Sequence, residues 1–293
     1  MMQEEKTYTE IRILINEEVS DLLSNFLVEE GSGGVVLEDN QTKGNVWLVA
    51  YFPKGEDKNK LHSIHNYLDK LKELGLKVGG VKVQTKEVKQ EEWPKNWRKG
   101  FKSIFITDRI VIQPPWEKEK LAGKTIIKIN PQMAFGTGEH STSKLCIKSL
   151  EKFIKDKDRV LDVGTGSGIL AITAARLGAS YVLALDIDPL ALENAKENIK
   201  LNRVQKEIEL KSGTVNHNLP KNSFDIVVAN LDKSAIIRLF EQMKETAKKN
   251  AIFILSGILD KEEEEVKNHL KKMKVKFSGS SRDEEWSCIV AQG

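Results

Sequence analysis

The second half of the chain changes repeatedly between short apolar runs and longer stretches with apolar residues at helical spacing. This pattern predicts strands separated by helices. The predicted strands are residues 159–163, 181–186, 208–211, 224–229 and 251–255, and helices are predicted to begin near Ile169, Pro189, Ser234 and Lys261. Such alternation is typical of a mainly parallel, doubly wound α/β sheet. Two further apolar runs, 275–277 and 286–291, predict closing strands that pair antiparallel at the sheet edge.

The first part of the chain has a different rhythm, with strands that follow one another directly. The alternation predicts strands at 9–15, 33–38, 45–52 and 78–88, and helices at 17–30 and 57–74. The resulting order, β-α-β-β-α-β, is typical of a small ferredoxin-like α+β domain. We therefore predict a domain over residues 1–89.

Residues 90–103 break both patterns and predict a helical linker. Pro94 suits the first turn of a short helix, on which Trp93, Trp97 and Phe101 share one face because they lie four residues apart. Packing of these rings onto a domain is the favoured interpretation over ligand stacking. The second domain is predicted over 104–293, with short strands through 112, a strand at 125–129, a glycine-bearing loop and a helix over 141–154.

The composition agrees with a fully folded chain and excludes several functions. Hydrophobic residues make up 40% of the 293 residues, with seven prolines, so little of the chain is expected to be disordered. The net charge is only +3 and there are eight arginines, so we expect no direct nucleic-acid substrate, while binding near RNA stays open. Cys146 and Cys288 form no disulfide framework or metal motif. With neither a signal sequence nor a membrane-length apolar run, we expect a cytoplasmic protein. We also expect it to act as a monomer.

The candidate chemistry centres on VLDVGTGSG, where the strand at 159–163 runs into alternating glycines. Gly164, Gly166 and Gly168 lie on the turn from this strand to the helix that begins at Ile169. Glycine permits positive φ and a close backbone approach to a ligand, and the N–H groups at a helix start are free to bind it. The turn therefore predicts a site for a nucleotide-type cofactor.

Two carboxylates reinforce this interpretation. Asp186 ends the next strand, where a carboxylate meets the ribose hydroxyls of a nucleotide. Asp162 lies just before the turn, where it can hydrogen-bond loop amides or reach the polar end of a cofactor. Asp188 precedes Pro189, so we expect it to cap a helix instead of binding a metal.

Asn230 is the strongest single candidate for a role in the reaction. It ends the predicted strand that reads DIVVAN, at the carboxyl edge of the sheet where ligands of open α/β folds bind. A neutral amide at this edge can orient an amine, and the alternative role is a cap on the next helix. Thr142 and Ser143 offer hydroxyls at the start of the helix at 141–154, and they can cap that helix and bind a ligand as well.

The spacing of the glycines separates two enzyme classes. A nicotinamide dehydrogenase has G-x-G-x-x-G after its first strand, whereas this chain has D-x-G-x-G-x-G. That pattern resembles the first motif of Rossmann-type S-adenosylmethionine methyltransferases. On this resemblance, the turn from Gly164 to Gly168 approaches the methionine moiety and Asp186 the ribose.

A closer resemblance covers nearly the whole chain. The segments MAFGTG-x-H, VLDVGTGSGILAI, ALDIDP, VVAN, LSGIL and EEWSCIV occur in this order, after GVVLED and EEWPKNWRKGF. Together they resemble the methyltransferase family of large-subunit ribosomal protein eleven. The resemblance implies a substrate-recognition domain at 1–89, a linker and a methyltransferase domain. It also implies methylation of lysine side chains and of the α-amino group of that ribosomal protein.

The resemblance implies cofactor contacts at Ser143, Gly164, Asp186 and Asn230, and we add Thr142, Asp162 and Gly166 to this set. The chain departs from the family pattern at four positions, which bear on loop geometry and substrate range. Gln132 replaces a common Gly, Ser143 a common Thr, Asn130 a common Asp and Asp232 a common apolar residue.

The histidines predict no metal and no general base. His62 and His65 lie three residues apart without a third ligand, His140 is expected to order its loop, and His217 to lie on the surface. Two other functions stay open. The enzyme could methylate another protein or a small molecule, or the chain could be a catalytically silent ribosome-binding factor, although Gly164, Asp186 and Asn230 are intact.

Overall fold

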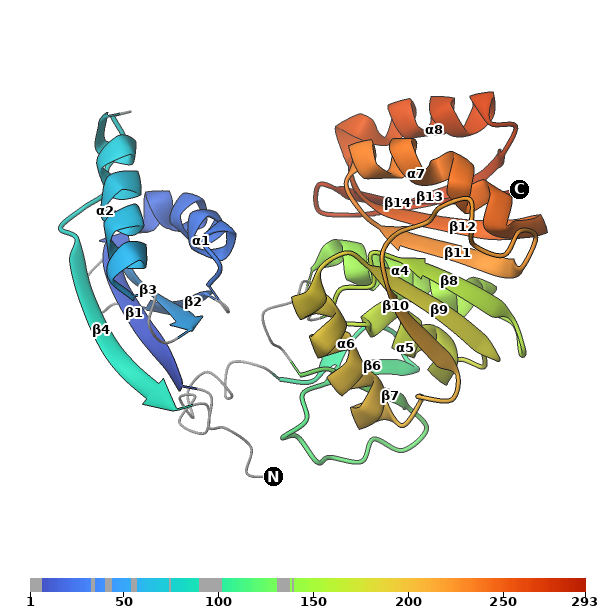
Figure 1. The fold of residues 1–293 in the computed structure, drawn as a ribbon, viewed down its shortest axis with the longest axis horizontal. Coiled ribbons are helices and arrows are strands. Elements are labelled where there is room, and N and C mark those ends of the chain that lie inside the picture. The colour runs from blue at the N-terminus through green and yellow to red at the C-terminus, as the bar shows by residue number, and fades with distance from the viewer. Residues whose placement is uncertain are drawn as a thin grey trace. The chain divides into compact units, whose positions relative to one another are not determined.

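The computed structural model describes residues 7–32, 35–39, 44–53, 57–73, 75–89, 102–130, 138 and 140–293. The chain divides into two compact units, Met1–Phe101 and Lys102–Gly293 (Figure 1). The predicted linker at 90–103, with Trp93 and Trp97, falls outside the described residues except for its last two positions. None of the helices within the described ranges is long and apolar enough to cross a membrane.

The first unit is built on an antiparallel sheet of four strands. Its central strand, β1 (Thr7–Asn16), alternates apolar and polar residues and buries Ile11, Ile13 and Ile15 completely on one face. The sheet has the order β2-β3-β1-β4, with β2 at Val35–Asp39, β3 at Asn45–Pro53 and β4 at Lys82–Lys89. All neighbouring pairs are antiparallel.

Two helices cover the buried face of this sheet. A short 3₁₀ turn, η1 (Glu17–Val19), leads into α1 (Ser20–Glu29), and α2 (Asp57–Glu73) connects β3 to β4. Leu23 and Leu27 of α1 join Ile64 and Leu68 of α2 in one core with the β1 isoleucines. The elements therefore follow one another in the predicted order β-α-β-β-α-β.

One strand of this unit is shorter than its apolar pattern predicts. The strand predicted at 78–88 begins only at Lys82. Val78 is buried and its carbonyl accepts a hydrogen bond from the Asn16 N–H at 2.9 Å, but Gly79 then takes a φ of +79°. A left-handed residue cannot continue a strand, so the apolar residues before it serve the core from a loop.

The second unit has a sheet of seven strands in the order β10-β9-β8-β11-β12-β14-β13. Its first five strands are parallel to one another. In spatial order they are β10 (Ile208–Ser212), β9 (Tyr181–Asp186), β8 (Arg159–Val163), β11 (Phe224–Asn230) and β12 (Ala247–Leu259). β14 (Trp286–Gln292) pairs antiparallel with β12, and β13 (Lys276–Asp283) is the edge strand beside it. The predicted α/β alternation and the antiparallel closing strands are confirmed.

Helices cover both faces of this sheet, because its central strands are apolar on both sides. Val160, Leu161 and Val163 of β8 are at most 1% exposed, as expected for a strand buried between two layers. One layer contains α4 (Ser141–Phe153), α5 (Ile169–Arg176) and α6 (Pro189–Asn202). The other contains α7 (Lys233–Thr246) and α8 (Glu263–Lys272), which follows the 3₁₀ turn η3 (Asp260–Glu262).

A small third sheet joins the unit beside α5 and α6. It has the order β5-β6-β7, formed by Ile104–Phe105, Ile110–Gln113 and Thr125–Lys128. Apolar residues of β6 and β7 extend the core under α4 and α5. After β7 the described chain continues to Asn130.

Buried asparagines on α6 tie this small sheet to the glycine turn. Asn194, Asn198 and Asn202 are spaced four residues apart and are at most 7% exposed. Asn202 exchanges two hydrogen bonds with the backbone of Lys128, at 2.6 and 2.8 Å. The side-chain oxygen Oδ1 of Asn198 accepts from the Asn130 N–H at 2.8 Å, and the side-chain nitrogen Nδ2 of Asn198 donates to the Ser167 carbonyl at 2.9 Å. One side chain therefore joins two loops that are distant in sequence.

We predict that Asn198→Leu destabilises the protein although it adds apolar volume to a buried site. The substitution leaves the Asn130 N–H and the buried Ser167 carbonyl without their partner, and an unsatisfied buried group costs about 1–3 kcal/mol. Urea unfolding followed by circular dichroism measures this loss. Asn216→Ala is the control, because Asn216 is exposed and caps only a local turn; an equal effect of both substitutions would contradict the linking role of Asn198.

Candidate active site

A cavity of about 680 Å³ opens at the carboxyl ends of the parallel strands of the second unit. Its walls come from the glycine turn after β8, the ends of β9 and β11, and the first turns of α4 and α7. Thr142, Ser143, Gly164, Gly166, Asp186 and Asn230 all line it. Six of the seven predicted site residues thus share one cavity.

The glycine turn has the backbone shape that the sequence predicts. Gly164, Gly166 and Gly168 have φ values of +74°, +55° and +81°. The N–H groups of Gly164 and Thr165 both donate to the Leu185 carbonyl at 2.9 Å, which fixes the turn against the end of β9. A Cβ atom on Gly164 would lie 2.5 Å from the Leu231 Cδ2, so this position leaves no room for a side chain.

Asp186 links the turn to the next loop through its two carboxylate oxygens. Its Oδ2 accepts from the Gly166 N–H at 2.8 Å and its Oδ1 accepts from the Asp188 N–H at 3.0 Å. Asp188 accepts from the Leu190 N–H at the start of α6, with Pro189 in the first turn, so its predicted capping role is confirmed. Asp186 lines the cavity, and each of its carboxylate oxygens has a lone pair that these hydrogen bonds do not use.

Asp162 lies beneath the turn and does not line the cavity. It is fully buried, and its Oδ2 accepts from the Thr165 hydroxyl at 2.6 Å and from the Ala171 N–H at 3.1 Å. Burial raises the pKa of Asp162 to about 7, although both hydrogen bonds lower it in part. The predicted hydrogen bonds to loop amides are replaced by one to the Thr165 hydroxyl and one to an amide of α5, while contact with a cofactor stays a prediction.

A chain of three side chains orients Asn230. The Nδ2 of Asn230 donates to the Thr142 hydroxyl oxygen at 3.1 Å, and that hydroxyl lies 2.8 Å from Nδ1 of His140. The same Nδ1 accepts from the Thr142 N–H at 3.3 Å and caps α4, whereas the loop-ordering role predicted for His140 stays a prediction. Because Nδ1 is an acceptor, the neutral ring carries its proton on Nε2 and the Thr142 hydroxyl donates to Nδ1.

The surroundings of His140 keep its ring neutral. Burial lowers the pKa of His140 below its ordinary value of 6.5, although the charges of Glu284 and Glu285 raise it in part. The Trp286 ring meets the imidazole edge-on, with 5.0 Å between the centroids, and also lines the cavity. The neutral state is the one that the hydrogen bonds to Thr142 require.

Ser143 presents a hydroxyl without a partner. It is 1% exposed, its Oγ is buried, and within the described ranges no residue forms a hydrogen bond with that atom. A buried hydroxyl left unsatisfied costs free energy, so such groups in native proteins point to a missing partner. Ser143 lines the cavity, so a ligand bound there can supply that partner.

The loop after β11 sets Asn230 in place by close backbone packing. Asp232, not Asn230, caps α7 by accepting from the Ala235 N–H at 2.9 Å. The Leu231 N–H donates to the Ser256 carbonyl at 3.0 Å. A Cβ atom on Gly257, whose φ is +85°, would lie 2.3 Å from the Leu231 carbonyl oxygen. Asn230 is thus free of the capping role and is held by the backbone that follows it.

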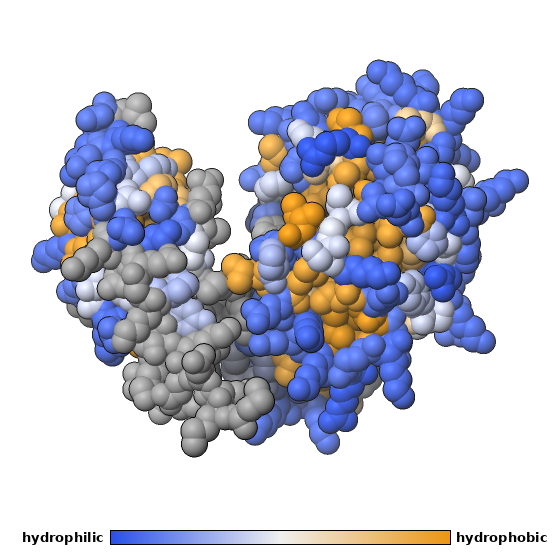
Figure 2. Space-filling view, viewed as in Figure 1, coloured by the Kyte–Doolittle hydropathy of each residue, from blue (hydrophilic) through white to orange (hydrophobic). Residues whose placement is uncertain are grey.

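Several cavity residues were not singled out from the sequence: Ile187, Thr214, Arg238, Gly257 and Trp286. Ile187 is 73% exposed and Leu190 60% exposed, and Figure 2 shows hydrophobic surface on this unit between α6 and α7. The sequence signal that could have identified Ile187 is an apolar residue between Asp186 and Asp188, directly after the end of the strand. Trp286 comes from the far end of the chain, and its place follows only from the antiparallel pairing of β14 with β12.

Some predicted features fall outside the described residues or away from the cavity. Gln132 of the glycine-bearing loop is not among the described residues. Asn130 is described, and its N–H is bound by Asn198. His65 contacts the Leu61 carbonyl through Nδ1 at 2.7 Å, and His217 is exposed beside Glu245. In the part of the chain that the structure describes, no three His, Cys, Asp or Glu residues are arranged to hold a metal ion.

The geometry agrees with the comparisons to known proteins. A family model described as ribosomal protein L11 methyltransferase (PrmA) matches residues 7–293. The ribosomal protein L11 methyltransferase of Caldicellulosiruptor bescii is 40% identical over 308 residues, covering 97% of this chain and 98% of that protein. The protein of the same name from Clostridium perfringens is 35% identical over 312 residues, covering 98% and 99%.

A solved structure gives the same result at the level of the fold. The ribosomal protein L11 methylase from Lactobacillus delbrueckii subsp. bulgaricus is 30% identical in sequence, with a TM-score of 0.61, and the match covers 65% of this chain and 98% of that one. The sequence resemblance is therefore confirmed, and this chain belongs to the ribosomal protein L11 methyltransferase family.

Proposed function

We propose that this enzyme transfers methyl groups from S-adenosylmethionine to lysine side-chain and N-terminal amines of ribosomal protein L11. Family membership and the names of the relatives support the reaction and the acceptor. The observation that carries the proposal is the cavity itself. It brings the glycine turn, the Asp186 carboxylate, the unpartnered Ser143 hydroxyl and the Asn230 amide together at the carboxyl edge of a parallel sheet.

The cavity residues fit the donor's chemistry. Asp186 retains acceptor capacity for a ribose diol, the turn around Gly164 and Gly166 allows a close approach, and Ser143 offers a buried hydroxyl that needs a partner. The exposed Ile187 suits an apolar ring face. We therefore assign donor binding to Thr142, Ser143, Gly164, Gly166, Asp186 and Asn230.

When bound, S-adenosylmethionine supplies a methyl group on a positively charged sulfur, which a neutral amine can displace in line. The protein's part is to position and desolvate that amine. Because Nδ2 of Asn230 is engaged by Thr142, its Oδ1 is available to accept a hydrogen bond from the amine. A neutral carbonyl holds the amine without a negative charge that would favour its protonated, unreactive form.

We also propose the division of labour between the two units. The first unit is a ferredoxin-like substrate-recognition domain, supported by the order of its elements and by the β2-β3-β1-β4 arrangement of its antiparallel strands. Residues 90–103 form a helical linker, and the second unit carries the methyltransferase chemistry. Action as a monomer stays a prediction.

Two alternatives change only part of this proposal. The same cavity could methylate another protein or a small molecule, which would keep donor binding and change the acceptor. A silent ribosome-binding factor would keep the fold and lose the reaction. Incubating labelled donor with a cell extract, followed by mass spectrometry of the labelled proteins and small molecules, separates all three: the label appears on L11, on another acceptor or on none.

We predict that Ser143→Ala weakens binding of S-adenosylmethionine by about three- to tenfold, the loss of one hydrogen bond. The ligand-free protein should keep or slightly raise its thermal stability, because the substitution removes an unsatisfied hydroxyl. Isothermal titration calorimetry and thermal unfolding measure the two effects. Ser149→Ala is the matched control on the same helix, since the Ser149 hydroxyl lies 3.6 Å from the Cys288 sulfur and does not line the cavity.

We predict that Asn230→Ala lowers the rate of methyl transfer at saturating donor and acceptor by roughly a hundredfold, because it removes a positioned hydrogen-bonding group. The fold should be retained, since Asp232 and not Asn230 caps α7. Methylation of purified L11 followed by mass spectrometry gives the rate. An unchanged rate in a folded variant would exclude Asn230 from the reaction.

We predict an additional acid limb in the pH profile of methyl transfer that comes from His140. Its lowered pKa means that the ring is neutral at pH 7 and becomes protonated only below 6.5, where Nδ1 can no longer accept from Thr142. Because only the deprotonated acceptor amine reacts, its titration alone makes the rate fall about tenfold for each unit by which the pH is lowered. Below the His140 pKa the wild-type rate should fall about a hundredfold per unit, whereas His140→Gln should keep the tenfold slope throughout.

A further inference from the structure

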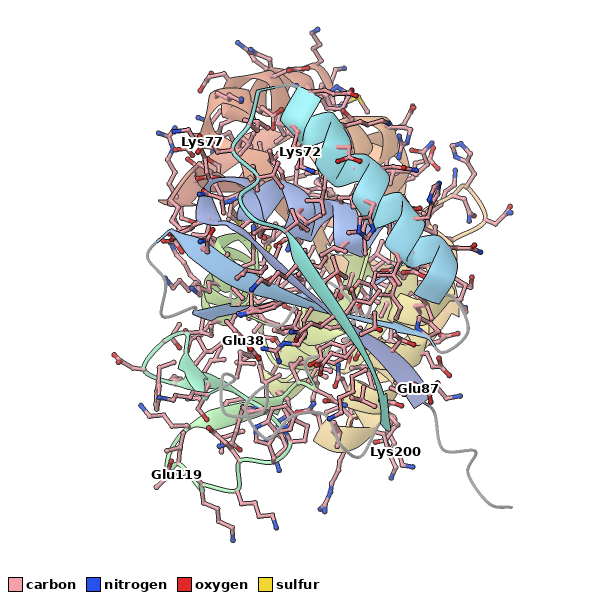
Figure 3. The ribbon with its side chains drawn as sticks, turned by 90° about the vertical axis from the view of Figure 1, so that its left-hand side faces the viewer. Glu38, Lys72, Lys77, Glu87, Glu119 and Lys200 are labelled. Carbon is pink, nitrogen blue, oxygen red and sulfur yellow. The ribbon has the colours of Figure 1, made fainter. Side chains whose placement is uncertain are left out.

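A second cavity lies in the first unit, between α2 and β4. It has a volume of about 440 Å³ and is lined by Leu61, His65, Leu68, Asp69 and Lys72 of α2 and by Val81, Val83 and Thr85 on the β4 side. Figure 3 shows β4 running beside α2, with Lys72 and Lys77 near one end of the pair and Glu87 near the other. We call this feature the β4 groove. The proposed methyl-transfer reaction uses none of its residues.

The floor of the β4 groove is apolar and its rim carries little net charge. Leu61, Val81 and Val83 are half-buried and Leu68 is 1% exposed, so an apolar side chain entering the groove would cover them further. On the rim, Asp69 and Lys72 form an ion pair at 2.9 Å, and Lys72 lowers the pKa of the exposed Asp69. The paired charges leave the groove suited to apolar side chains.

β4 also offers backbone groups for pairing. Among the described strands it is the last one on its side of the sheet, because the order is β2-β3-β1-β4. It pairs with β1 over residues 82–89, so its other edge presents N–H and C=O groups in strand geometry. An extended peptide can add to such an edge while alternate side chains enter the adjoining groove.

The register of β4 shows what lies on its opposite face. Ile11 and Ile13, which face the core, pair with Thr85 and Val83, whereas Glu10 pairs with Lys86 and Leu14 with Lys82. Lys82 and Lys86 therefore project from the face away from the groove, and both are exposed. No ion pair joins either lysine to another residue in the described part of the chain, and the neighbouring Glu10 lies 3.8 Å from Arg12.

We propose that the β4 edge and the β4 groove bind an extended segment of a partner protein in which apolar and acidic residues alternate. Its apolar side chains enter the groove beside Val83 and Thr85. Its acidic side chains point to the opposite face, beside Lys82 and Lys86. Backbone hydrogen bonds to β4 supply the pairing, and the alternation gives the specificity.

The same lysines argue against a second copy of this chain as the occupant. Two β4 strands paired with each other would bring Lys82 and Lys86 of each copy onto one face, and like charges across a strand pair are unfavourable. Lysines on an edge strand are a common guard against self-association. An acidic strand meets no such repulsion, because the positive charges of Lys82 and Lys86 attract it.

The test uses the full-length protein and a fluorescein-labelled heptapeptide with the sequence Val-Glu-Val-Asp-Val-Glu-Val. We expect saturable binding by fluorescence anisotropy at low salt. Peptides of the same composition with the apolar and acidic residues in separate blocks, or with lysine in place of the acids, should bind at least tenfold more weakly. Two further versions of the heptapeptide carry N-methyl groups on alternate residues, one on the odd-numbered and one on the even-numbered positions. They should differ in affinity, because only one of them loses the N–H groups that face β4.

Charge reversal on the protein gives the decisive comparison. K82E/K86E should weaken binding of the acidic peptide about tenfold and strengthen binding of the lysine peptide. K70E/K77E makes the same change of net charge on exposed lysines outside the β4 edge and should change binding less than twofold. Thr85→Arg places a bulky side chain in the groove at an exposed position. It should weaken binding of the acidic peptide and of the lysine peptide, because it occupies the space of their apolar side chains.

Any of four results would overturn the proposal. The alternating acidic peptide does not bind, or the peptide with its apolar and acidic residues in separate blocks binds equally well. The two N-methylated peptides bind equally well, or the two double variants change binding equally. Dimerisation in sedimentation that K82E/K86E changes would instead identify a second copy as the occupant. None of these readouts depends on methyl transfer, so they test the peptide-binding proposal independently of the proposed reaction.

Discussion

The hydrogen bond from the Gly166 N–H to the Asp186 carboxylate is the contact on which the geometry of the active-site cavity depends. It joins the glycine turn after β8 to the end of β9, at 2.8 Å, while the Leu185 carbonyl holds the start of the same turn. Parallel strands end at one edge, and this edge is where helix N-termini with free N–H groups also begin. Binding groups from distant parts of the sequence meet there as a result of topology.

The same edge explains why the site combines rigid and polar parts. The turn and the Asn230 loop are fixed by backbone contacts with little free space, whereas Thr142, Ser143 and His140 come from the first turn of α4. Asn198 on α6 links the Ser167 carbonyl of the turn to the backbone of Asn130. The pieces of the cavity are thus connected by hydrogen bonds that lie behind its walls.

Much of this arrangement follows from local patterns in the sequence. Strands such as 159–163 and 181–186 have the predicted bounds, because continuous apolar runs ended by glycine or aspartate are unambiguous. The strand predicted at 251–255 extends over Ala247–Leu259, since pairing with β11 and β14 continues past its apolar centre. Trp286 and the His140–Thr142–Asn230 chain depend on tertiary pairing that no local pattern encodes. Asp162 was placed beside the turn correctly, but only the structure shows that it is buried beneath it.

Leu231 lies between two glycines that exclude side chains for different reasons. At Gly164 an added Cβ would meet the end of the Leu231 side chain, whereas at Gly257 it would meet the Leu231 backbone. A smaller residue at position 231 would remove the contact with a Cβ at 164, but the φ of +74° would still strain any other residue there. No side chain at 231 can do the same for 257, so variation at this glycine requires the whole loop to move.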